Sequence, residues 1–123
     1  MKNIILITVI MFCIVHTPFA QAVLRVSTGT HLSMSSNTRI VLSNIGFENN
    51  GTTGFATSSR FIFTGNSPVA NITGIGNILF SELEINKSAG ILQLNRFVNV
   101  FTGVQFTSGN IDLNGNQFIF VAD

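Results

Sequence analysis

Apolar residues alternate with polar ones along residues 77–121, and the alternation returns at a nearly constant spacing. Each repeat holds three pairs of apolar residues two positions apart. The pairs begin at Ile78, Val98 and Phe118 on the first side, at Leu83 and Val104 on the second, and at Leu92 and Ile111 on the third. Counterparts are therefore separated by nearly the same length of chain on all three sides. Alternation with a period of two, bounded by Asn, Gly and Ser, predicts short strands, and three strands per repeat indicate a three-sided coil.

Residues 24–76 show the same spacing of apolar pairs less regularly. Ile40/Leu42 and Phe61/Phe63 lie one such period apart, as do Leu24/Val26 and Ile45/Phe47. Leu32 and Met34 are expected to form the third side before Ile40, and Phe55 fills the side between. The step from Ile40/Leu42 to Ile45/Phe47 equals the step from Ile78/Phe80 to Leu83/Ile85. We therefore expect these two steps to occupy equivalent places in their coils. In the shorter coil from 61 to 76, the pattern places further sides around Val69, Ile72 and Ile75.

Each coil exposes a row of apolar side chains that it cannot bury alone. Stacking coils at about 4.8 Å pairs each strand with the one above and the one below, which buries those rows. The alternative all-β fold is an antiparallel sandwich, whose hairpins would turn at Asn50-Gly51 and Asn114-Gly115. A sandwich gives no reason for a constant three-sided period. The pattern therefore favours an all-β solenoid.

Residues 1–22 have a different pattern. Lys2 precedes an apolar run from Ile4 to Val15, and Ala20 and Ala22 then fit the small-x-small cleavage pattern. The run is shorter than the ~20 residues that a membrane-spanning helix needs. We therefore predict a secretory signal peptide over 1–22 and a β-solenoid domain over 23–123, secreted or at the cell surface and not membrane-bound after cleavage. The alternative is an uncleaved anchor.

Charge and chemistry narrow the function classes. Charged residues make up 9% of the chain and the net charge is +1, so no basic patch favours nucleic acid. Glu82 and Glu84 alternate with apolar neighbours and are predicted to point outward as an acidic pair. Paired carboxylates suit glycoside hydrolysis or a calcium-assisted lyase, but they also keep an exposed strand soluble. The sequence predicts no catalytic residue, no metal site and no cofactor.

The segments GNILFSELEIN, SAGILQLN and SGNIDLNGNQF, which lie between Gly76 and Phe118, resemble the repeats of right-handed parallel β-helices. The similarity is to pectin-lyase-like coils in large secreted bacterial surface proteins of the Bacteroidota type, with adhesin-like architecture. The resemblance implies a structural rod and a longer array, of which 23–123 would be an incomplete or N-terminal segment. It also implies that further coils follow.

Two functional hypotheses result. The first is an exported structural or adhesive surface module without catalytic activity. The second is a carbohydrate-binding or carbohydrate-degrading β-helix truncated before its active coils, with surface glycans as ligands. Because a solenoid end needs a cap, Phe118 and Phe120 form a candidate association edge, where further coils of the same or another chain would pack.

Overall fold

The computed structural model describes residues 21–121, and within that range it contains strands and no helix. The predicted cleavage residue Ala20 and most of the predicted signal peptide lie outside the described residues. The strands are β1 (Val23–Val26), β2 (His31–Met34), β3 (Arg39–Ser43), β4 (Gly46–Asn49), β5 (Thr52–Phe55), β6 (Arg60–Gly65), β7 (Val69–Thr73), β8 (Leu79–Leu94), β9 (Val98–Asp112) and β10 (Phe118–Phe120).

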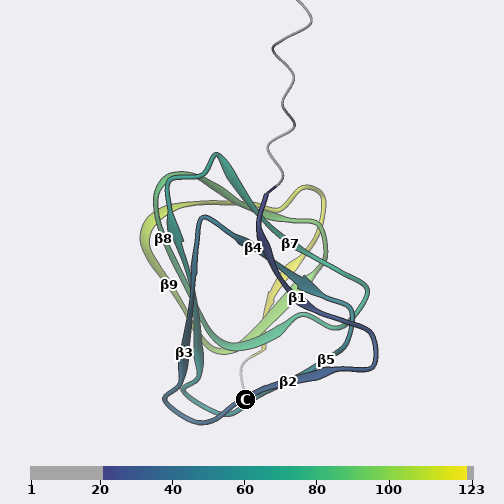
Figure 1. The fold of residues 1–123 in the computed structure, drawn as a ribbon. Coiled ribbons are helices and arrows are strands. Elements are labelled where there is room, and N and C mark those ends of the chain that lie inside the picture. The colour runs from purple at the N-terminus through teal and green to yellow at the C-terminus, as the bar shows by residue number, and fades with distance from the viewer. Residues whose placement is uncertain (1–20, 122–123) are drawn as a thin grey trace, which may run out of the picture.

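All the strand pairs are parallel, and each joins a strand to its counterpart about one coil away. Figure 1 looks nearly along the stack, and the successive coils overlie one another as three-cornered outlines. This arrangement confirms the predicted parallel β-helix and excludes the antiparallel sandwich. β8 and β9 are long because each turns two corners without leaving the sheet, so each contributes to more than one side.

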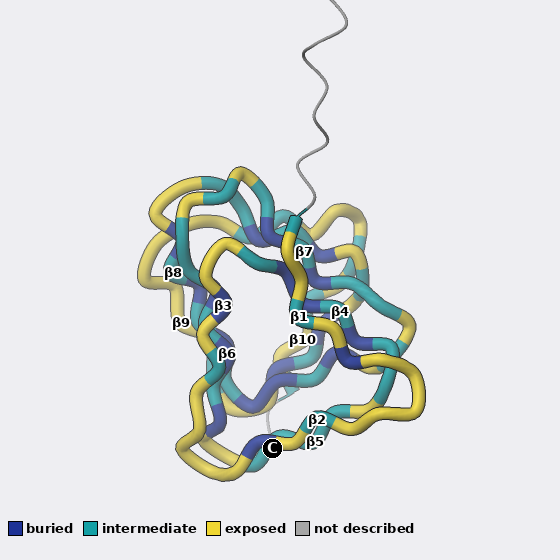
Figure 2. The backbone as a smooth tube through the Cα atoms, viewed as in Figure 1, coloured by how far each residue is buried: buried dark blue, intermediate teal, exposed yellow. Residues whose placement is uncertain are grey.

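The second side shows how the stack is built. Ile40 pairs with Phe61, Phe61 with Leu83 and Leu83 with Val104, so the inward residues of four coils form one column. The residues between them along each strand point outward and are more exposed, as the alternating colours in Figure 2 show. Each large inward side chain contributes about 1.5–3 kcal/mol when fully buried. The apolar alternation thus sets both the strand register and the core.

The three predicted ladders of residues 77–121 are confirmed. Phe118 pairs with Val98, Leu83 with Val104, and Leu92 with Ile111. The buried core runs through all of the coils and consists mainly of these inward residues. Its members are Val26, Met34, Leu42, Phe47, Phe61, Phe63, Ala70, Ile72, Ile78, Phe80, Leu83, Ile85, Leu92, Leu94, Val98 and Val100.

One predicted register in the N-terminal half is wrong. Leu24 pairs with Phe47 rather than with Ile45, and Val26 pairs with Asn49. Asn49 is fully buried, its side chain donates to the carbonyl of Asn77, and it accepts the N–H of Gly51. The pattern of apolar pairs does not identify this asparagine as an inward residue, because its burial depends on hydrogen bonds that satisfy its amide.

The predicted equivalence of the two equal steps is also wrong. Ile40 and Leu42 lie in the second-side column with Leu83 and Ile85, whereas Phe47 pairs with Ile72 on the third side. The coils differ in corner length, so equal steps along the chain join different sides.

The coil from 61 to 76 holds a further correction. The pattern places Ile75 on an inward side, but Ile75 is 73% exposed in a bend after β7. Ala70 and Ile72 are the buried residues of that side. The adjacent Gly74 has a φ of +117°, and the bend that follows it turns Ile75 outward.

The first side changes along the stack. β2 and β5 form a separate two-stranded sheet, so the predicted third-side place of Leu32 and Met34 is wrong, because β1, β4 and β7 form that side. Figure 1 shows the β2–β5 sheet at the bottom of the view, outside the later strands. Phenylalanine rings occupy the wider interior of these coils. Phe61 has ring centroids 4.8 Å from Phe80, 5.0 Å from Phe55 and 5.2 Å from Phe47. From Leu83 onward, the buried apolar residues are leucine, isoleucine and valine.

Candidate functional site

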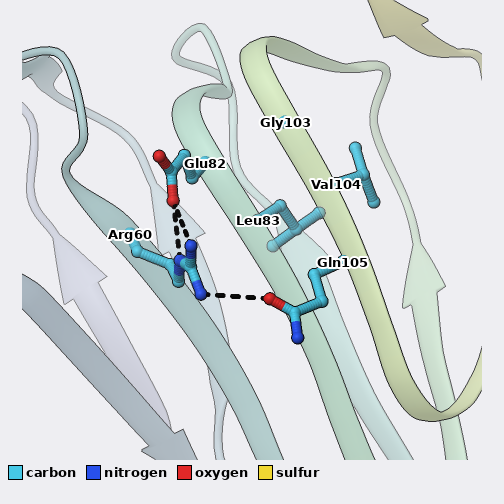
Figure 3. Close-up of a pocket in the computed structure, with 6 residues that line it drawn as sticks. All are labelled: Arg60, Glu82, Leu83, Gly103, Val104 and Gln105. Carbon is cyan, nitrogen blue, oxygen red and sulfur yellow. Dashed lines mark hydrogen bonds and ion pairs between the residues drawn. The ribbon is translucent and has the colours of Figure 1, made fainter.

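Glu82 and Glu84 lie on the outward face of β8, on either side of the buried Leu83. The strand before them in the stack, β6, brings Arg60 beside Glu82. The guanidinium of Arg60 lies 2.6 Å from Glu82 Oε2 and 3.1 Å from Glu84 Oε2. Its Nη1 also donates to Gln105 Oε1 at 3.1 Å, on β9, two coils from Arg60. Figure 3 shows Arg60 between Glu82 and Gln105.

These contacts determine what the acidic pair can do. The side chains of Glu82 and Glu84 retain 19% and 13% of their exposure, and one cation serves both of them. The hydrogen bonds to Glu82 and Glu84 raise the pKa of Arg60. Thr107 donates to the second oxygen of Glu84 at 3.2 Å. The two carboxylates are therefore part of a cross-strand ion network. This differs from a catalytic pair, in which a proton donor lies opposite a free carboxylate.

Sequence reasoning missed Arg60. The signal was present, because Arg60 precedes Glu82 by one coil of the sequence period. Residues one coil apart in a parallel stack are neighbours, so opposite charges at that spacing pair directly. Arg25 and Glu48 form a second such pair at 2.8 Å across β1 and β4.

Two shallow cavities flank this network. One has a volume of about 180 Å³ and is lined by Arg60, Glu82, Leu83, Gly103, Val104 and Gln105. The other has a volume of about 280 Å³ and is lined by Asn37, Arg39, Ser58, Arg60 and Glu82. Asn37 and Ser58 adopt positive φ angles of 61° and 63° in two stacked turns. These turns project beside the sheet and form one wall of the second cavity.

The other candidate chemical groups lie apart from one another. His31 Nδ1 is 2.8 Å from the Thr52 hydroxyl on the outward face of the β2–β5 sheet. Asp112 lies on the third side, where bonds from Gln93 and from the N–H of Asn114 lower its pKa. Within residues 21–121, no group of three potential metal ligands comes together. Over the same range, no helix is long and apolar enough to cross a membrane.

Lys87 is a buried charge that the sequence pattern did not reveal. It is 1% exposed at an inward position of β8, paired with Gly65 in the coil before it and close to Gly109 in the coil after it. Its ammonium group donates to the Ser67 hydroxyl at 3.2 Å. Burial lowers the pKa of Lys87. Gly109 leaves room beside Lys87, because a Cβ at Gly109 would lie 3.0 Å from the Cβ of Lys87. Lys87 therefore contributes to the packing of that corner.

The candidate association edge, Phe118 and Phe120, lies on β10, the last described strand of the first side. Phe118 is partly buried, whereas Phe120 is 52% exposed. On the other two sides, in the coil below β10, Phe106 is 59% exposed and Leu113 is 44% exposed. The apolar surface at this end therefore extends over all three sides, beyond the two residues that the sequence suggested.

Ala22, the described residue of the predicted cleavage pattern, joins the solenoid. Its carbonyl accepts the N–H of Gly46 at 2.9 Å. Gln21 also contacts the third side, where its side chain accepts from Asn71 at 2.7 Å and donates to the carbonyl of Val69.

The comparisons with known proteins add no relative. No family model matches the chain, no curated protein matches its sequence, and no solved structure matches its fold.

Proposed function

We propose that this chain is an exported structural or adhesive surface module without catalytic activity, built like the repeat regions of large secreted bacterial surface proteins. The observation that carries the proposal is the pairing of Glu82 and Glu84 with Arg60. The outward acidic pair is the group most suited to catalysis, and it is occupied by a cross-strand ion network. The apolar core, which runs through all of the coils, supports a structural rod rather than a pocket that holds a substrate.

Exposed aromatic residues on the first side support the adhesive part of the proposal. Phe97 and Phe101 are 40% and 38% exposed and flank the outward Asn99. Ile119 pairs with Asn99 and is 38% exposed. Exposed apolar groups gathered on one face are typical of interaction surfaces. Glycan binding at this face is the second candidate function, because rings and an amide can contact the apolar and hydroxyl surfaces of a sugar.

Export is tested first, by expressing the full chain in a bacterial host and sequencing the N-terminus of the secreted product. The proposal expects Val23 as the first residue. A product that keeps residues 1–22 would contradict export through a cleaved signal peptide.

Catalysis and glycan binding are tested on the secreted product. We expect no release of reducing ends or unsaturated sugars from a panel of polysaccharides, and no change in the Glu82→Gln variant. Polysaccharide cleavage that Glu82→Gln abolishes would overturn the non-catalytic proposal. Binding on a glycan array that Phe101→Ser removes would assign the adhesive role to the first side, and a blank array would exclude glycan binding.

A further inference from the structure

The outward face of the first side carries a symmetric set of residues where β9 begins. Residues 97–101 read FVNVF, the same in both directions. Val98 and Val100 are buried, so the residues between and beside them point outward. These outward residues are Phe97, Asn99 and Phe101, and the two rings are 40% and 38% exposed. A phenylalanine therefore lies on each side of a central asparagine.

The strands above and below extend this face with apolar residues. Asn99 pairs with Leu79 of β8 below it and with Ile119 of β10 above it. Ile119 is 38% exposed, and Leu79 is partly buried. Because strands lie on both sides of this stretch of β9, the face belongs to the lateral surface of the stack and not to its end.

The face differs from the second side in its charge. Among the described residues, the outward positions of the first side include no Asp, Glu, Lys or Arg, whereas the second side carries two arginines and two glutamates. Arg96 lies at the rim, where its guanidinium is 5.5 Å from the Phe97 ring centroid and donates to the carbonyl of Gly74. Aromatic residues without charges are typical of the centre of a protein–protein interface.

Asn99 is the polar group at the centre of this face. The asparagines of the third side bond one another, Asn114 to Asn95 at 2.8 Å and Asn95 to Asn71 at 3.1 Å. Within residues 21–121, the amide of Asn99 has no such ladder, because its neighbours in the column are apolar. A carboxamide carries both donors and an acceptor, so two of them that face each other can form two hydrogen bonds. A second copy of Asn99 therefore complements the first.

From this symmetry we infer that the first side is a homodimer interface, in which two copies of the chain pack face to face about a two-fold axis through Asn99. The axis lies between the two faces and runs along the stack. It sets Phe97 of one copy against Phe101 of the other, and Asn99 against Asn99. Such a contact uses the same patch on both copies, so it closes at two chains. The inference deepens the proposed adhesive role, on which it rests, by naming a second copy as the partner.

The size of the face determines how strong the contact is. Five residues along the strand and three rungs of the stack cover roughly 200–250 Å². Because a stable complex buries about 800 Å² on each partner, the dimer is expected to be weak and to form only at high concentration. Weak contacts act together when many copies are held on one surface. This property suits an adhesive surface module.

Sedimentation equilibrium of the secreted product, from about 10 µM to about 1 mM, tests the inference. We expect the average mass to rise from that of a monomer toward that of a dimer. Asn99→Asp and Asn99→Lys should each weaken dimerisation by about tenfold or more, because like charges then face each other across the axis. An equimolar mixture of the two variants should dimerise again, because a carboxylate then faces an ammonium group.

Val41→Asp is the control, because Val41 is 58% exposed on the outward face of β3, on the second side. It should leave dimerisation unchanged. A wild type that stays monomeric at every concentration would overturn the inference, as would equal weakening by Val41→Asp. A dimer that Asn99→Asp leaves intact, or a mixture of the two Asn99 variants that stays monomeric, would exclude a two-fold axis through Asn99 and would also overturn it.

The proposed function is judged separately, because none of these masses bears on export or catalysis. Glycan binding that Phe101→Ser removes, by a wild type that stays monomeric, would assign the first side to glycans. The adhesive role would then stand, and the dimer would be excluded.

Discussion

The coils at the two ends of this solenoid solve the same packing problem with different side chains. In the N-terminal coils, the corner between the first and second sides is long, running from Met34 to Ile40 and from Phe55 to Phe61. The coil above turns the same corner between Phe80 and Leu83. The longer corners push the β2–β5 sheet outward, and phenylalanine rings fill the space. Coils with corners of different length thus share one core, and the aromatic cluster spans the place where the corner length changes, since Phe55 precedes and Phe61 follows the long corner and Phe80 precedes the short one.

One strand register therefore accommodates corners of two lengths. The second-side column remains continuous from Ile40 to Val104 even though the first side shifts outward. Parallel stacking therefore fixes only the pairing of neighbouring strands. Each corner is free to vary in length so long as the interior remains filled to normal density.

The largest expected effect is at the centre of the aromatic cluster. Phe61→Ala removes a ring that is 1% exposed and packs against Phe47, Phe55 and Phe80. We expect a loss of about 3–5 kcal/mol in the free energy of unfolding, measured by urea denaturation. Phe106→Ala is the control, because Phe106 lies at the open end, and should cost less than about 1 kcal/mol. Equal losses would show that the last coil is covered in solution.

The next effect concerns the contact between Gly90 of β8 and the coil of β6 and β7. Gly90 has a φ of +74°, and a Cβ there would strike the carbonyl oxygens of Ser67 and Pro68 in the coil below. Gly90→Ala is therefore expected to cost about 2–3 kcal/mol in thermal or urea unfolding. Gly103→Ala is the matched change, since a Cβ at Gly103 meets nothing within 4 Å. It should alter stability by no more than about 0.5 kcal/mol, and an equal loss would contradict the stacking described at this corner.

A smaller effect on the free energy of unfolding is expected at Lys87, and its sign is measured from the pH dependence of stability. Because burial lowers its pKa, the unfolded chain holds more protons between the lowered value and the ordinary value of 10.5. The free energy of unfolding should therefore rise with pH across this window. Lys87→Met removes the buried charge and should stabilise the protein by about 1 kcal/mol near neutral pH. A pH dependence that survives unchanged in Lys87→Met would contradict the assignment.

The smallest expected effect lies on the outward face. Arg60→Met leaves Glu82 and Glu84 without their shared cation. Because the network is partly exposed, we expect a loss of only about 0.5–1 kcal/mol, decreasing as salt is added. Arg39→Met is the control, because Arg39 lies one coil away in the same outward column. If the loss exceeds that of Gly90→Ala, the network holds the coils together more strongly than the core does.

Sequence reasoning predicted the fold because the spacing of apolar pairs along the chain equals the sequence separation of paired residues in neighbouring coils. Ile78, Val98 and Phe118 could be aligned from their spacing alone. It failed at Asn49 and Ile75, where hydrogen bonds or a left-handed glycine, rather than hydrophobicity, decide the direction of the side chain.

The candidate site was only half predicted. The acidic pair was placed outward by alternation, but Arg60 was found only once the coils were stacked. Lys87 is inward despite its charge, because the Ser67 hydroxyl accepts from its ammonium group and Gly109 leaves room beside it.

Residue-resolved amide hydrogen exchange is the measurement that bears most directly on the parallel stack. In the coil of β8, the amides of both Leu83 and Glu84 should exchange slowly, because β6 lies on one side of them and β9 on the other. Fast exchange at either amide would show that one of these neighbouring strands is missing in solution and would contradict the parallel stack.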